Sequence, residues 1–133
     1  MEQQKLTILL VDDSVLVAGK IKSLLQELQV TEHVMYAENY DKAAEVISSI
    51  KPHIAILDIH LPGKSGIDLL AYIKAKFSDI KVVMLSNQSD LTYRDTCKKM
   101  GADFFLDKTT EFDLLPGVIL SLNKQDSNPT TSI

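Results

Sequence analysis

The feature that most restricts the fold is an apolar run that ends abruptly on an acidic residue, within the stretch 53–70. Residues 54–57 are all apolar and rich in isoleucine, and they stop at Asp58. Such a run predicts a strand that is buried on both faces of a parallel sheet. A proline and two glycines follow shortly after it and indicate a turn. We therefore expect Asp58 at the carboxyl end of a central strand, where open α/β sheets bind ligands.

The rest of the chain alternates similar runs with stretches whose apolar residues recur every three or four positions, which is typical of amphipathic helices. Five strands that alternate with five helices predict an α/β fold with a parallel sheet covered on both faces. Right-handed crossovers in a short chain favour a doubly wound sheet of strand order 2-1-3-4-5. The expected strands are residues 6–11, 33–37, 54–57, 81–85 and 104–107.

Short polar residues that can cap a helix stand at the expected start of each helix. Pro116 falls inside the last expected helix, which should end near Asn123, and its missing amide predicts a kink. The fourth helix has a thin apolar stripe, so we expect it to be the most loosely packed. The expected caps are Ser14 after the acidic pair, Asn39, Ser65 or Gly66, Asp90, and Thr110 with Asp113 as a capping-box-like pair.

Composition restricts the class of protein. A chain of 133 residues suits one domain, which we place at residues 1–123, with residues 124–133 as a flexible tail. The net charge of −4 argues against general binding to nucleic acid or to a membrane surface. The single cysteine, Cys97, excludes an internal disulfide, and the three scattered histidines lack the spacing of a zinc site. The start of the chain carries no signal peptide and no apolar run reaches membrane-spanning length, so we expect a cytoplasmic protein.

Polar residues that follow four of the expected strands should meet at one edge of the sheet. In the predicted order the first and third strands are neighbours, which brings Asp12, Asp13 and Asp58 together. Two like charges about 4 Å apart cost roughly 4 kcal/mol at an effective dielectric of about 20, so the cluster should retain a proton or bind a cation such as Mg²⁺. Ser86 and Lys108 reach the same edge. A cation, an ammonium and a hydroxyl around one carboxylate form a site for a phosphoryl group, with an aspartyl phosphate as the covalent product.

Four motifs resemble, in order and spacing over residues 6–123, the receiver domain of two-component response regulators, which has the flavodoxin/CheY-like fold. They are Val-Asp12-Asp13-Ser, Leu-Asp58-Ile-His-Leu-Pro62-Gly-Lys-Ser-Gly66, Leu-Ser86-Asn and Gly101-Ala-Asp-Phe-Phe105-Leu-Asp-Lys108. The resemblance implies that Asp58 accepts a phosphoryl group from phosphohistidine in a Mg²⁺-dependent reaction. It also implies slow self-hydrolysis of the product, and a signalling switch rather than an enzyme.

The resemblance also implies a role for each site residue. Ser86 and Lys108 would bind phosphoryl oxygens. Phe105 would be the switch aromatic, which turns inward as the Ser86 hydroxyl moves and so changes the face of the fourth helix, fifth strand and fifth helix. The implied ligands of Mg²⁺, or of Mn²⁺ in its place, are Asp13, Asp58 and the backbone carbonyl of His60, with Asp12 assisting through water.

Several positions near these motifs bear on how such a site would work. Asn87 stands where the family commonly has a smaller residue, and it would narrow access to the acceptor. Thr109 stands where a proline usually follows the lysine. The family has a cis peptide bond there, which costs about 3 kcal/mol without proline, so the sequence leaves the position of Lys108 open. His60 and Gln88 flank the expected path of water, and we hypothesise that they set the lifetime of the phosphorylated form.

The implied phosphoryl donor is a sensor histidine kinase or a histidine phosphotransfer protein, and the signal passes to a downstream protein or to a fused output domain. This domain itself should contact neither nucleic acid nor membrane, and formation of a homodimer on phosphorylation is a further expectation. One alternative is the N-terminal receiver of a DNA-binding transcriptional regulator. Another is an FMN-binding flavodoxin-like protein on the same fold, although two acids after the first strand would repel its phosphate. A degenerate receiver that acts only in docking should lack the acidic pair or the lysine, and all are present here.

Overall fold

The computed structural model of the chain describes residues 5–87 and 92–127. Its centre is a five-stranded parallel sheet of order β2-β1-β3-β4-β5, so the predicted topology is confirmed. The second strand begins two residues earlier than predicted. The strands are β1 (Leu6–Val11), β2 (Thr31–Ala37), β3 (Ile54–Asp58), β4 (Lys81–Ser86) and β5 (Phe104–Asp107).

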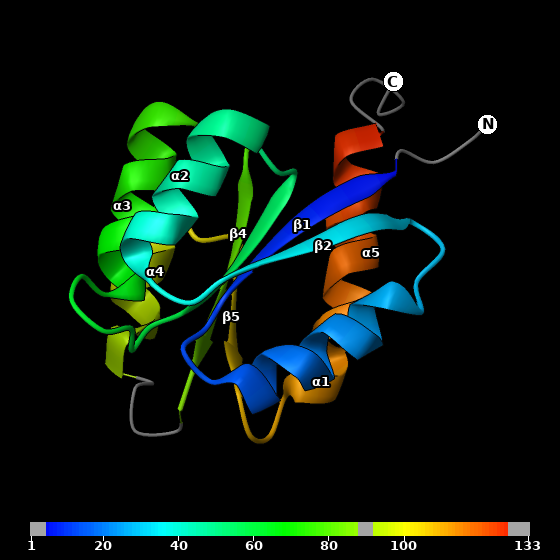
Figure 1. Cartoon of the computed structure of the whole chain (residues 1–133), viewed down its shortest axis with the longest axis horizontal. Helices are drawn as coiled ribbons and strands as arrows, with labels where there is room; N and C mark the ends of the chain where they lie inside the picture. The colour runs from blue at the N-terminus through cyan, green and yellow to red at the C-terminus, as the bar shows by residue number, and fades with distance from the viewer. Residues whose placement is uncertain (1–4, 88–91, 128–133) are drawn as a thin grey trace.

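Helices cover both faces of the sheet (Figure 1). One face carries α2, α3 and α4, and the other carries α1 and α5. Successive side chains of a strand point to opposite faces, so each strand contributes to both apolar layers. The near-continuous apolar runs of the sequence are therefore the consequence of burial on both sides. The helices are α1 (Val15–Gln26), α2 (Tyr40–Ile50), α3 (Gly66–Lys76), α4 (Arg94–Lys99) and α5 (Leu115–Ser127), with a 3₁₀ turn, η2 (Phe112–Leu114), before α5.

Three helices begin at the caps that the sequence predicts. Ser14 Oγ accepts from the amide of Val17 at 3.3 Å, and Asn39 Oδ1 accepts from the amide of Lys42 at 2.9 Å. Ser65 forms a full capping box with the third residue of α3. These bonds satisfy amides that have no partner within the first helical turn. The expected cap Asp90 lies outside the described residues, and in the short α4 only Cys97 is buried.

The predicted capping pair of the last helix is wrong. Glu111, rather than Thr110, is the cap residue of η2, and it makes no side-chain capping bond. The amide of Thr110 instead donates to the Asp107 carboxylate at 3.2 Å. A turn built around Asp107 therefore replaces the expected helix start.

The extent of the last helix also differs from the prediction. Pro116 is the second residue of α5, so it lies in the first turn, where its missing amide breaks no helical bond and causes no kink. The helix ends at Ser127 rather than near Asn123. Residues 124–127 are thus helical and not part of a tail, and residues 128–133 lie outside the described part of the chain.

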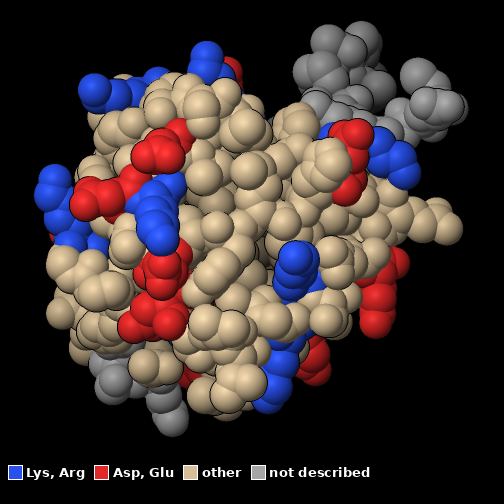
Figure 2. Space-filling model, viewed as in Figure 1, with Lys and Arg blue, Asp and Glu red and all other residues tan. Residues whose placement is uncertain are grey.

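Charged side chains of both signs are interleaved on the face of the molecule seen in Figure 2. The described residues on that face form no broad basic surface of the kind that binds nucleic acid. Within residues 5–87 and 92–127, no helix combines the length and apolar character needed to cross a membrane.

Gly66, at the start of α3, lies against the backbone of the acidic strand end. Its amide donates to the Ile59 carbonyl at 2.8 Å. A β-carbon at this position would overlap the carbonyl of Asp58, whose carbon atom would be only 2.8 Å away. Because the obstacle is backbone, no side-chain rotation can relieve it.

We expect Gly66→Ala to lower the free energy of unfolding by about 1–3 kcal/mol, the usual cost of overpacking. Gly19→Ala is the matched control, because a β-carbon on Gly19 in α1 meets nothing within 4 Å. That change should raise the free energy of unfolding by roughly 0.5–1 kcal/mol, since alanine favours a helix. Urea denaturation measures both, and equal stabilities of the two variants would contradict the packing argument.

Candidate functional site

The register of the sheet places four polar strand ends along one edge. Asp12 directly follows the last residue of β1 that pairs with β3, so it lies level with Asp58. Asp58 closes β3 beside β4, Ser86 closes β4 beside β5, and Lys108 follows β5. Because parallel strands end at the same edge, side chains that are distant in sequence meet there.

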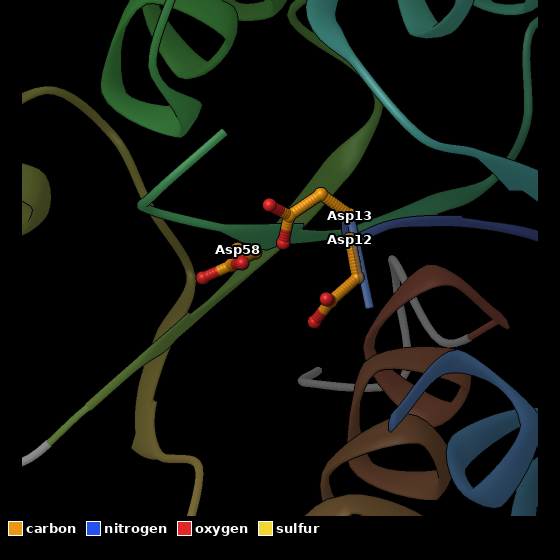
Figure 3. Close-up of side chains that lie close together, drawn as sticks. All are labelled: Asp12, Asp13 and Asp58. Atoms are coloured by element: carbon orange, nitrogen blue, oxygen red, sulfur yellow. The ribbon is translucent and has the colours of Figure 1, made fainter. Parts of the chain in front are cut away.

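Three carboxyl groups gather at this edge (Figure 3). One carboxylate oxygen from each of Asp12, Asp13 and Asp58 lies within 4.8 Å of the other two. Asp12 is fully buried and Asp58 is 4% exposed, whereas Asp13 is exposed. The structure thus brings together the three acids that the strand order predicted to meet, with one of them open to solvent.

Lys108 forms ion pairs with two of these acids. Its Nζ lies 2.8 Å from Asp12 Oδ2 and 3.2 Å from Asp58 Oδ2, and its side chain is only 13% exposed. Its amide donates to the Ser86 carbonyl at 2.7 Å. Every peptide bond in the described residues is trans, including that between Lys108 and Thr109, so the cis bond expected from the family pattern is not found. The lysine nevertheless reaches the acids.

The charges of the cluster are unequal, since three carboxylates face one ammonium. Burial raises the pKa of Asp58 above its ordinary value, Lys108 opposes this rise, and the charge of Asp12 adds to it. Burial alone would lower the pKa of Lys108, but its hydrogen bond to Asp12 and the charges of both acids outweigh that effect and raise it. Lys108 therefore remains a cation, and the cluster keeps an excess of negative charge that a second cation can neutralise.

Ser86 brings a buried hydroxyl to the same edge. The residue is fully buried, and Oγ has no hydrogen-bond partner among the residues that the structure describes. A buried hydroxyl without a partner costs free energy, so this one is available to a ligand that enters the site.

The predicted residues around Asp58 differ in what the structure shows of them. His60 donates its backbone amide to Asp58 Oδ1 at 3.3 Å, while the metal-binding role of its carbonyl stays a prediction. Asn87 follows β4 and is exposed. Gln88 lies outside the described residues, so its tuning role also stays a prediction.

Phe105 is buried in the layer under α2, α3 and α4, with 8% of its surface exposed. The Arg94 guanidinium lies over its ring at 4.9 Å from the centroid, and Nη1 donates to the Phe105 carbonyl at 3.3 Å. Phe104 packs toward the opposite layer. The aromatic residue that the family resemblance marks as the switch is thus inward and covered by a cation from α4.

Sequence reasoning missed two supports of the site. The Tyr36 hydroxyl donates to the backbone carbonyl of Asp12 at 2.6 Å, and burial followed by the charge of Asp12 raises the pKa of Tyr36. A tyrosine one residue before the end of the strand beside β1 was the available signal. The second support is the turn in which Asp107 accepts from Thr109, signalled by an aspartate two residues before a threonine at a strand end.

Comparison with known proteins agrees with this geometry. The family model "Response regulator receiver domain" matches residues 8–119. The chain is 33% identical over 108 residues to the chemotaxis protein CheY of Listeria monocytogenes, covering 81% of this chain and 90% of that protein. It is 27% identical over 115 residues to the transcriptional regulatory protein DegU of Brevibacillus brevis, covering 86% of this chain. It spans about half the length of DegU and of several other curated regulators that it matches.

A solved structure shows the same arrangement of the chain. The receiver domain of NtrX from Brucella abortus superposes with a TM-score of 0.81 at 28% sequence identity. The match covers 88% of this chain and 98% of that one. The fold is therefore that of receiver domains.

We expect Asp58→Asn to raise the free energy of unfolding at pH 7 in the absence of divalent cations. The folded state raises the pKa of Asp58 above the ordinary 3.8, so ionisation of this group costs stability as the pH rises through that window. The gain of the variant should therefore shrink as the pH falls through the raised pKa toward 3.8.

Urea denaturation in EDTA between pH 3.5 and 7 measures this dependence. Asp13→Asn is the control, because Asp13 is exposed and its replacement should change stability less. A gain for Asp58→Asn that grows toward low pH would contradict the sign of the shift.

Proposed function

The chain belongs to the family of response regulator receiver domains, and from this premise we propose that Asp58 accepts a phosphoryl group from a phosphohistidine. The observation that carries the proposal is the pairing of a buried carboxylate with Lys108 Nζ at 3.2 Å, beside two further acids. Receiver domains are regulatory, so the reaction modifies the protein itself and the domain acts as a switch.

Three groups of this chain can support the transfer: the Asp58 carboxylate, the Lys108 ammonium and the Ser86 hydroxyl. A carboxylate oxygen of Asp58 attacks phosphorus, and an O–P bond forms as the P–N bond breaks and leaves its electron pair on the imidazole. The Lys108 ammonium neutralises one phosphoryl oxygen, and the Ser86 hydroxyl donates to another. Water later breaks the O–P bond and restores the carboxylate, with inorganic phosphate as the product.

The acidic cluster suits a divalent cation. Three carboxylates against one ammonium leave an excess of two negative charges, and carboxylate oxygens are the ligands that Mg²⁺ prefers. We propose that Asp13, Asp58 and the backbone carbonyl of His60 hold Mg²⁺ or Mn²⁺, with Asp12 acting through water. When bound, the ion neutralises phosphoryl oxygens at the acceptor.

The switch that reads the modification is proposed to run through Ser86 and Phe105. As the Ser86 hydroxyl turns toward the phosphoryl group, the Phe105 ring, which is already buried, shifts further into the space beside that hydroxyl. The ring contacts Arg94 of α4, so its movement alters the surface formed by α4, β5 and α5. His60, Asn87 and Gln88 are proposed to set the lifetime of the modified form.

The phosphoryl donor is proposed to be a sensor histidine kinase or a histidine phosphotransfer protein. The relatives include a chemotaxis protein of which the chain covers 90% and a transcriptional regulatory protein of which it covers 49%. The signal therefore passes either to a separate protein or to a fused output domain such as a DNA-binding module. Homodimer formation on phosphorylation is proposed for either case.

Binding of FMN is not favoured, because Asp12 and Asp13 stand in the loop after β1 and would repel its phosphate. Asp12 Oδ1 also accepts from the Ser14 amide at 2.8 Å, so this amide is already bonded.

Incubation with acetyl phosphate and Mg²⁺ should add one phosphoryl group to the wild-type chain, detected by intact-mass spectrometry. Asp58→Asn should take up none, because it has no carboxylate to attack phosphorus. Lys108→Met should react at least about tenfold more slowly, as expected for loss of a charge-assisted contact. Equal uptake by Asp58→Asn and the wild type would remove Asp58 from its role.

Addition of MgCl₂ should stabilise the wild-type chain at constant ionic strength. Binding to the folded state alone raises the free energy of unfolding by about 2.7 kcal/mol at a concentration 100-fold above Kd. Asp13→Asn should lose most of this gain. Asp79→Asn, which removes an exposed acid between α3 and β4, should keep it. Thermal unfolding measures all three, and equal gains in both variants would contradict the site.

A further inference from the structure

We propose that Asp107 and Thr109 form a side-chain turn that sets the Lys108 ammonium between Asp12 and Asp58. In this reading Thr109 is a positioning residue for the acceptor reaction, and the inference rests on the proposed function. It explains how a lysine followed by a trans peptide bond reaches the buried acids.

The turn is closed around one buried carboxylate. Asp107 is 4% exposed, and its Oδ1 accepts from Thr109 Oγ1 at 2.7 Å, from the Thr109 amide at 2.8 Å and from the Thr110 amide at 3.2 Å. At the other end, the Asp107 amide donates to Glu111 Oε1 at 2.8 Å, and the Glu111 amide donates to the Asp107 carbonyl at 2.9 Å. The backbone from residue 107 to residue 111 is therefore tied at both ends.

Lys108 lies inside this turn, between the acceptor Asp107 and the donor Thr109. Its own amide donates to the Ser86 carbonyl at 2.7 Å, which fixes it to the end of β4. A lysine side chain has a flexible four-carbon stem, so a fixed backbone reduces the freedom that must be lost when the ammonium meets two acids. The site thus depends on residues that touch neither the acids nor a phosphoryl group.

The Thr109 hydroxyl is the side-chain donor of the turn, and a substitution can remove it cleanly. Its hydrogen bond, followed by that of the Thr109 amide, holds the pKa of Asp107 below its ordinary value. Asp107 therefore stays an ionised acceptor near neutral pH. Valine has the shape of threonine without the hydroxyl, and serine keeps the hydroxyl.

The first test is the rate of phosphorylation by acetyl phosphate with saturating Mg²⁺. We expect Thr109→Val to be slower by about fivefold to tenfold, the size expected for one lost hydrogen bond. Thr109→Ser should restore a rate close to that of the wild type. Thr96→Val, at an exposed threonine of α4, is the matched control and should leave the rate unchanged.

The second test does not depend on phosphorylation. Acetylation of lysine amines by an N-hydroxysuccinimide ester, followed by peptide mass spectrometry, should label Lys108 slowly compared with the exposed Lys22. Thr109→Val should increase labelling of Lys108 severalfold without changing that of Lys22, and Thr109→Ser should not. This measurement reports only the accessibility of the Lys108 amine, so it remains valid even if Asp58 is not a phosphoryl acceptor.

A double-mutant comparison separates positioning from general damage to the fold. In a Lys108→Met background, Thr109→Val should slow the reaction no further, because the residue it positions is gone. Two outcomes would overturn the inference: unchanged rate and unchanged Lys108 labelling in Thr109→Val, or a further slowing in the Lys108→Met background. Uptake of phosphate by Asp58→Asn would instead refute the proposed function. The labelling of Lys108 would still show whether the turn positions this lysine.

Discussion

The double ion pair of Lys108 with Asp12 and Asp58 is the interaction on which the site depends. It joins the ends of β1, β3 and β5, which are separated by long stretches of sequence. Without the ammonium, two buried carboxylates would face each other with no neutralising partner, at a cost that burial makes large. With it, the cluster still carries more negative than positive charge. The fold thus holds a charged site whose excess of negative charge a further cation could neutralise.

This arrangement is tolerable because the charges lie at the carboxyl ends of the strands, at the margin of the apolar layers. The strands fill both layers with side chains that are almost completely buried, and the polar groups begin at the last residues of the ladder. Gly66 shows how closely the apolar core and the polar edge meet, since α3 starts against the carbonyl of Asp58. The same strand that supplies core packing therefore also fixes the position of Asp58.

Local structure followed from sequence wherever one residue and its near neighbours decide the outcome. The caps at Ser14, Asn39 and Ser65 are of this kind, because a short side chain reaches an amide only three residues away. The prediction for the start of the last helix was wrong because two acidic side chains could bond the same amide. In the expected capping box the Asp113 carboxylate would accept from the Thr110 amide. The Asp107 carboxylate accepts from that amide instead, and sequence spacing does not tell which of the two acids it will bond.

The sequence by itself determined the strand order, the edge at which polar residues collect, and which side chains stand there. Apolar runs, turn residues and short crossovers leave few ways to build a parallel sheet of this size. The tertiary structure alone decided how those side chains meet: that Lys108 bridges two acids across a trans peptide bond, that the Ser86 hydroxyl has no partner in the described residues, and that Arg94 covers Phe105. The physical reason is that the spacing of residues along the chain fixes the direction of a strand and the level of its residues on the sheet. Side-chain contacts between elements depend on the packing of several elements at once.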